Sequence, residues 1–148
     1  MKKILTLLLI TFCLFACDDF TSQEDVNIKE IEDILLEIEL GFNMNDLSRI
    51  TTFYHQEFLH NNEDYDDEVY RWEQRIIKYL EMDIENIEIT FQNDYWAVAE
   101  FKLTFSNADE TAITEEPSEE NGDLSFFTKE NSEWKIIGNQ AEKKPSQD

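Results

Sequence analysis

The spacing of apolar residues changes once along this chain, and that change limits the fold more than any other feature. From residue 27 to residue 80, apolar side chains recur every three or four positions, which is the spacing of amphipathic helices. From residue 87 onward, apolar and polar side chains alternate, as they do in strands that bury one face. Helices followed by strands with one apolar face predict an α+β domain, in which the helices pack on an antiparallel sheet.

The helical region divides into three predicted helices. The first begins at Asn27, and its apolar stripe consists of Ile28, Ile31, Leu35, Ile38 and Phe42. The second follows Asn45 or Asp46, because either side chain can cap a helix. The third opens at Asp66 or Asp67, and its predicted inner stripe consists of Val69, Trp72, Ile76 and Leu80.

Four strands are predicted, at 87–91, 95–105, 124–129 and 134–139. The apolar positions of the strand 95–105 all fall on one face, and Trp72 and Trp134 are expected to be buried. The interval Asp109–Asp123, which joins two strands, contains seven carboxylates and no basic residue. It is predicted to be a solvated loop on which the fold does not depend. The functional alternatives for it are weak calcium binding or docking to a basic partner.

The N-terminus carries the most specific motif. Lys2 and Lys3 precede a 13-residue apolar run, which is too short to span a bilayer but suits a secretory signal. The run ends in Leu14-Phe15-Ala16-Cys17, which resembles the lipobox of bacterial lipoproteins. In that family a peptidase cuts before the cysteine, whose thiol carries a diacylglyceryl group. The resemblance implies that residues 1–16 are a signal peptide and that Cys17 is the lipidated residue.

Several consequences follow for the mature chain. Cys13 would be removed and Cys17 blocked, which excludes a disulfide, a thiolate metal site and a cysteine nucleophile. Residues 17–26 read as an acidic tether, 27–140 as the domain and 141–148 as a disordered tail. The mature chain carries 34 acidic and 10 basic residues, a net charge of −24. This charge argues against binding to nucleic acid, which needs clustered Lys and Arg.

The order of elements also resembles a known superfamily. Two helices, the segment Phe53–Leu59, a third helix and two hairpins ending in Glu133–Asn139 are similar to NTF2-like (SnoaL-like) domains. In those domains an "FY-x-x-x-F" segment leads out of the second helix, and a terminal strand of the form "W-K-I" is common. The resemblance implies a strongly curved sheet closed by helices into a cone, often with a pocket at its open end.

Two metal-site hypotheses can be formed from spacing. His55 and His60, with Glu57 nearby, lie near metal-ligand spacing but lack an HExxH pattern. The alternating oxygen ligands in Asn62–Glu68 lack the glycine and the final glutamate of an EF-hand loop, so the run reads as the acidic start of a helix. The sequence therefore predicts no metal and no cofactor.

Catalysis is the remaining question at the level of the sequence. Enzymes of the superfamily, such as ketosteroid isomerases and scytalone dehydratases, direct tyrosine, aspartate or histidine into the pocket. Their motifs do not map onto this chain, so no catalytic residue is predicted. The possible pocket-lining side chains are Tyr54, His55, Tyr70 and Tyr95.

The favoured hypothesis is a cell-envelope protein held at a membrane by lipid, with its domain outside the cytoplasm, either periplasmic or on the surface. The NTF2-like domain would bind a small hydrophobic ligand or a basic protein without catalysis. One alternative is a small-molecule isomerase, dehydratase or hydrolase on the same fold. The other is an acidic immunity-type inhibitor of a basic toxin.

Overall fold

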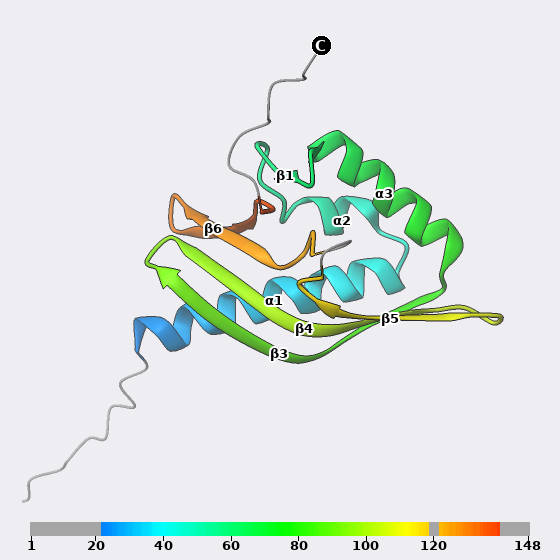
Figure 1. The fold of residues 1–148 in the computed structure, drawn as a ribbon, viewed down its shortest axis with the longest axis horizontal. Helices are drawn as coiled ribbons and strands as arrows, with labels where there is room; N and C mark the ends of the chain where they lie inside the picture. Colours follow the sequence, from blue (N-terminus) through cyan, green and yellow to red (C-terminus); the bar gives the residue numbers. More distant parts are fainter. Residues whose placement is uncertain (1–21, 119–121, 140–148) are drawn as a thin grey trace, which may run out of the picture.

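The structure, a computed structural model, describes residues 22–118 and 122–139. The predicted α+β class is confirmed, with helices packed on one side of an antiparallel sheet (Figure 1). The helices are α1 Gln23–Asn43, α2 Leu47–Thr51 and α3 Tyr65–Lys78. The strands are β1 Leu59–His60, β2 Glu63–Asp64, β3 Glu81–Asn93, β4 Trp96–Ser106, β5 Thr111–Glu116, β6 Phe126–Glu130 and β7 Glu133–Ile136.

Capping boxes set the first residues of the two longer helices. The Ser22 side chain accepts a hydrogen bond from the Asp25 N–H, and the Asp25 carboxylate accepts one from the Ser22 N–H. Asp64 and Asp67 make the same exchange at the start of α3. Helix α1 therefore begins at Gln23 rather than at Asn27. The prediction that residues 17–26 form a tether is wrong for 23–26, which are helical.

Strand β4 is the centre of the main sheet because both of its edges are paired. One edge pairs with β3 along its length. The other edge is shared, since Trp96–Val98 pair with β6 and Phe101–Ser106 pair with β5. Between these two pairings the Ala99 N–H donates to the Ser125 carbonyl at 2.9 Å. The chain between β5 and β6 thus approaches the sheet at the point where the two strands part.

A β-bulge in β3 explains why its apolar pattern shifts along the strand. The pairing with β4 shifts register between Glu85 and Glu88, and Asn86 has a positive φ of 58°. Before the bulge, Met82 and Ile84 are the buried residues of β3. After it, odd-numbered residues such as Ile87 pack against the core. The regular alternation from residue 87 predicted only the second half of this strand.

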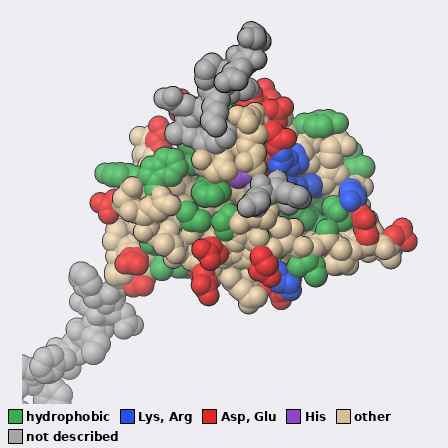
Figure 2. All heavy atoms as spheres, viewed as in Figure 1, with side chains coloured by type: hydrophobic (Ala, Val, Ile, Leu, Met, Phe, Trp, Pro, Cys, Tyr) green, Lys and Arg blue, Asp and Glu red, His purple; other side chains and the backbone are tan. Residues whose placement is uncertain are grey.

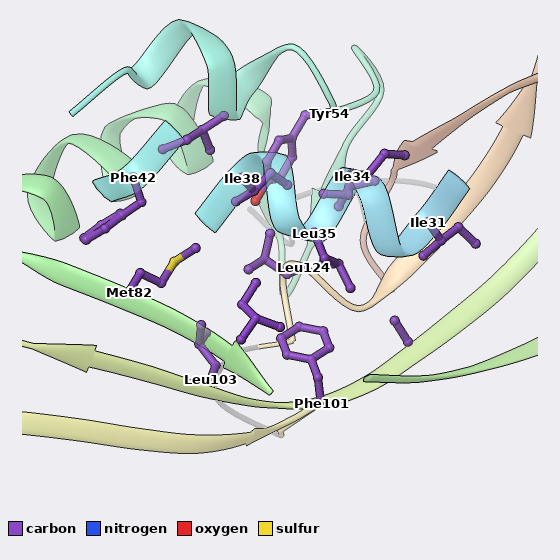
Figure 3. Packing of buried hydrophobic residues seen from close by; sticks show 14 of the residues in the cluster. Ile31, Ile34, Leu35, Ile38, Phe42, Tyr54, Met82, Phe101, Leu103 and Leu124 are labelled. Atoms are coloured by element: carbon purple, nitrogen blue, oxygen red, sulfur yellow. The ribbon is translucent and has the colours of Figure 1, made fainter. Parts of the chain in front are cut away.

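The core lies between α1 and the concave face of the sheet. Figure 3 shows α1 residues such as Ile31, Leu35 and Ile38 facing the sheet residues Phe101 and Leu103. Trp72 and Trp134 are buried, as predicted. Each such side chain contributes about 1.5–3 kcal/mol through removal from water.

The predicted inner stripe of α3 is wrong at its end. The helix stops at Lys78, and Leu80 is 71% exposed rather than buried. Tyr79, which follows the helix, is the buried residue at this end, and at the other end Glu68 is a charged residue that is 1% exposed.

Candidate functional site

A group of polar and charged side chains lies inside the domain, between α3 and the sheet. Its members come from three places in the sequence: the segment after α2, the inner face of α3, and the segment before β6. We call it the buried charge cluster, and it consists of Tyr54, Glu68, Trp72, Arg75 and Asp123.

Helix α3 places three of these side chains on one face. Glu68, Trp72 and Arg75 are four and three residues apart, so they lie along the same side of the helix. The sequence analysis assigned Glu68 to the solvated start of the helix, where the dipole favours acidic groups. The structure instead buries it, and its spacing of four from Trp72 is the signal that could have identified it.

Arg75 and Asp123 form a two-bond ion pair at the centre of the cluster. The guanidinium donates from Nη1 to Asp123 Oδ2 at 2.6 Å and from Nη2 to Asp123 Oδ1 at 3.3 Å. Nη1 also lies 3.4 Å from Glu68 Oε1. The guanidinium carbon lies 4.7 Å from the centre of the Trp72 ring, a cation–π contact.

Tyr54 connects the ion pair to the aromatic core. Its hydroxyl accepts a hydrogen bond from Trp72 Nε1 at 2.8 Å and donates to Glu68 Oε1 at 3.2 Å. Figure 3 shows Tyr54 pointing into the space between α1 and the sheet. Burial raises the pKa of Tyr54 well above its ordinary value, so the hydroxyl keeps its proton.

Two further buried polar side chains lie where β5 and β6 part beside β4: Glu116 ends β5, and Ser125 directly precedes β6. Glu116, the last residue of β5, is 4% exposed, and its Oε2 accepts from the Ser118 N–H at 3.0 Å. Within the described residues, Glu116 Oε1 and the fully buried Ser125 Oγ have no hydrogen-bond partner.

Burial affects the carboxyl groups of this region unequally. It raises the pKa of Glu116 to about 7. Burial and the neighbouring charge of Asp123 raise the pKa of Glu68 well above its ordinary value. Burial alone would also raise the pKa of Asp123, but the Arg75 charge and hydrogen bonds outweigh burial and hold it well below the usual range. The Arg75 charge therefore favours the ionised form of Asp123, whereas burial favours the protonated form of Glu68.

This assignment follows from the balance of charge. The Arg75 charge acts on the carboxyl groups of Glu68, Glu116 and Asp123, and a second guanidinium lies nearby, with Arg71 Nε 3.7 Å from Glu68 Oε2. Because Arg71 also pairs with Glu63, three ionised carboxylates here would leave buried negative charge without full compensation, which is costly. The interior is thus a neutralised ion pair with protonated carboxyl groups beside it.

The structure overturns the interpretation of Asp109–Asp123 as a solvated loop. Residues 111–116 form β5, and Asp123 supplies the buried carboxylate that binds Arg75. The density of acidic residues favoured a hydrated loop, but it could not show that the last acidic residue meets a buried arginine 48 positions earlier. Residues 119–121 of this interval lie outside the described residues.

Of the four predicted pocket-lining residues, Tyr54 and His55 line one surface groove together, whereas Tyr70 and Tyr95 are not among its lining residues. Tyr54 belongs to the buried charge cluster. His55 lies in the groove, of about 430 Å³, where its Nε2 is 2.9 Å from Glu130 Oε2. Tyr70 and Tyr95 are 61% and 63% exposed and lie apart from the cluster.

His60, the second histidine of the metal hypothesis, is buried between aromatic rings. Its ring lies 6.5 Å from that of Phe58 and 5.9 Å from that of Phe126, measured between centres. Across residues 22–118 and 122–139, no group of three or more His, Cys, Asp and Glu side chains is placed to hold a metal ion.

Known structures share this fold, although no family model and no curated sequence matches the chain. An NTF2-like protein of unknown function from Shewanella oneidensis is 17% identical, with a TM-score of 0.59 over 76% of this chain and 95% of that one. A protein of unknown function with a cystatin-like fold from Nostoc punctiforme is 16% identical, with a TM-score of 0.58 over 84% and 95%.

A ketosteroid isomerase-like protein from Erwinia carotovora is also similar, at 13% identity and a TM-score of 0.51 over 76% of this chain and 92% of that one. At such identities the likeness concerns the fold alone. The chain has the NTF2-like fold that its order of elements predicted.

We expect stability to fall as the pH rises from 5 to 8. The folded protein keeps a proton on Glu116 up to about pH 7, whereas a model carboxyl loses it near 4.5. The contribution of Glu116 to the free energy of unfolding is therefore complete below about pH 4.5 and is lost as the pH rises through 7. For a shift of this size the contribution is roughly 3 kcal/mol. Glu68 acts in the same direction. Urea unfolding at both pH values measures the slope.

Glu116→Gln should flatten this slope, because the amide is neutral at every pH. Glu57→Gln, at an exposed position, is the matched control and should keep the slope of the wild type. Equal stability of the wild type at pH 5 and pH 8 would contradict the assignment of buried protonated carboxyl groups.

Proposed function

We propose that the chain is a lipid-anchored cell-envelope protein whose NTF2-like domain binds a partner without catalysis. The proposal of binding without catalysis rests on the hydrogen bonds inside the buried charge cluster. Arg75 and Asp123 bind each other through two hydrogen bonds, and the Tyr54 hydroxyl is bonded on both sides. Groups paired in this way hold the fold together. Beside them, Glu68 Oε2, Glu116 Oε1 and Ser125 Oγ are buried with no hydrogen-bond partner among the described residues.

The N-terminal motif supports the first part of the proposal. The positive residues, the 13-residue apolar run and Leu14-Phe15-Ala16-Cys17 together resemble a lipoprotein signal. These residues lie outside the described part of the structure. No helix within the described part is long and apolar enough to cross a membrane. Two or three acyl chains on Cys17 would hold the domain firmly at a membrane, since each buried methylene contributes about 0.8 kcal/mol.

Replacing Cys17 tests the anchor. In Cys17→Ala the thiol that would accept the lipid is absent, so the chain should leave the membrane fraction or accumulate as the uncut precursor. Cys13→Ala is the control and should fractionate as the wild type does, because Cys13 lies in the segment to be removed. Fractionation is read together with the mass of the N-terminal peptide. An unmodified Cys17 in the native mature protein would contradict the proposal.

One observation favours an enzyme as the second candidate. Burial raises the pKa of Glu116 to about 7, and one of its oxygens has no hydrogen-bond partner among the described residues; a general acid or base has such properties. Such a group can act only if small molecules reach it.

Carboxyl labelling distinguishes the two candidates. A carbodiimide with an amine nucleophile at pH 6 modifies accessible carboxyl groups, and peptide mass spectrometry locates the label. If Glu116 is 4% exposed in solution, it should stay unlabelled until the protein is denatured, while the exposed Glu57 is labelled at once. Labelling of native Glu116 at the rate of Glu57 would favour the enzyme over the binding role.

A further inference from the structure

A groove of about 570 Å³ opens between the C-terminal half of α1 and the beginning of β3. Side chains of α1 hold its floor in place. Asn43 exchanges two hydrogen bonds with the Met82 backbone, at 2.8 and 2.9 Å, and the Glu39 carboxylate accepts from the Ile84 N–H at 2.9 Å. The groove is thus built on the junction of a helix with a strand edge, and its shape is fixed by the fold. Its lining residues are Glu39, Asn43, Leu80, Glu81, Met82, Asp83, Thr104 and Ser106.

The groove carries negative charge that no ion pair of the described residues neutralises. Glu81 and Asp83 are exposed, and neither forms an ion pair within the described residues. The two nearby lysines form ion pairs with other carboxylates: Lys78 with Glu110 at 2.9 Å and Lys102 with Glu85 at 2.6 Å. Figure 2 shows acidic side chains along the edge of the molecule formed by β3 and β4, with few basic ones among them.

Exposed apolar side chains lie along the margin of the same groove. Leu80 lines it and is 71% exposed. Ile113 is 61% exposed and stands opposite Thr104, a lining residue, in the pairing of β4 with β5. An apolar margin around unpaired carboxylates is typical of a protein-binding surface.

The groove lies at the end of the molecule that is opposite the start of α1, where the proposed lipid anchor is attached. Only five residues separate Cys17 from Gln23, a link of at most about 20 Å, so the start of α1 would be held close to the membrane. Helix α1 has 21 residues and extends about 32 Å. Figure 1 shows its C-terminal end, the start of β3 and the β4–β5 hairpin gathered at the opposite end of the molecule.

We propose that this groove and its apolar margin form a docking surface, the distal surface, for a basic protein segment that also presents apolar side chains. The inference rests on the proposed function, because it names the partner and the place of binding. Charge selects the occupant: a second copy of this acidic chain and an anionic lipid surface would both be repelled, whereas Lys or Arg would pair with Glu81 and Asp83. The apolar side chains of the segment would cover Leu80 and Ile113.

The test uses the full chain in nanodiscs of zwitterionic lipid, with empty nanodiscs as the background. The probes are three helical peptides of equal length: one of Lys and Leu, one with Ser in place of Leu, and one with Glu in place of Lys. The Lys/Leu peptide should bind at least tenfold more tightly than the other two, and its affinity should fall as salt is added.

Variants locate the binding on the molecule. Glu81→Gln with Asp83→Asn should weaken binding of the Lys/Leu peptide at least threefold, as should Leu80→Ser with Ile113→Ser. Glu57→Gln with Glu73→Gln removes the same charge from exposed positions elsewhere and should change the affinity less than twofold.

An equal loss in the matched control would mean unspecific attraction to an acidic protein and would overturn the proposal. Binding no stronger than to empty nanodiscs would overturn it as well. If Cys17 proved unmodified, the same titration would be made with the full chain free in solution. Loss of the peptide by the distal variants alone would then support the docking surface without the lipid anchor.

Discussion

The ion pair between Arg75 and Asp123 fixes how the C-terminal half of the chain meets the helices. Both charges lie away from water, so each depends on the other, and removing one partner of such a pair typically costs about 3–5 kcal/mol. Asp123 can reach the guanidinium only if the chain before β6 turns inward beside β4. For this reason β5 and β6 pair with different parts of the same edge of β4, and Glu116 and Ser125 are buried where they part.

The same constraint shapes the chemistry of the domain. Because Arg75 binds Asp123 through two hydrogen bonds, Asp123 takes the negative charge, while burial raises the pKa values of Glu68 and Glu116. Within the described residues, most charged side chains lie outside the core. This division supports a binding role that uses the outside of the fold, at the groove beside Glu81 and Asp83.

Apolar spacing was sufficient to predict the α+β class, the three helices, the inward face of β4 and the buried Trp72 and Trp134. Apolar spacing gave wrong predictions where contacts between distant parts of the chain determine the structure. The bulge at Asn86 reverses the alternation in β3, so its first half was missed. Strand β5 carries few apolar residues, so its composition predicts a loop rather than a strand. Most of the buried charge cluster was also missed, because a charged residue predicts exposure unless its partner is known, and the partner of Arg75 lies 48 residues away.

The claim that the cluster is a structural ion pair is tested most directly by a double-mutant cycle, with unfolding free energies measured in urea. The variants are Arg75→Met, Asp123→Leu and the two together. Each single variant is expected to lose about 3–5 kcal/mol of unfolding free energy, because the remaining charge is buried alone. The double variant is expected to lose clearly less than the sum of the two single losses. Single losses that are small, or that add up in the double variant, would show that the two charges do not depend on each other and would contradict the account.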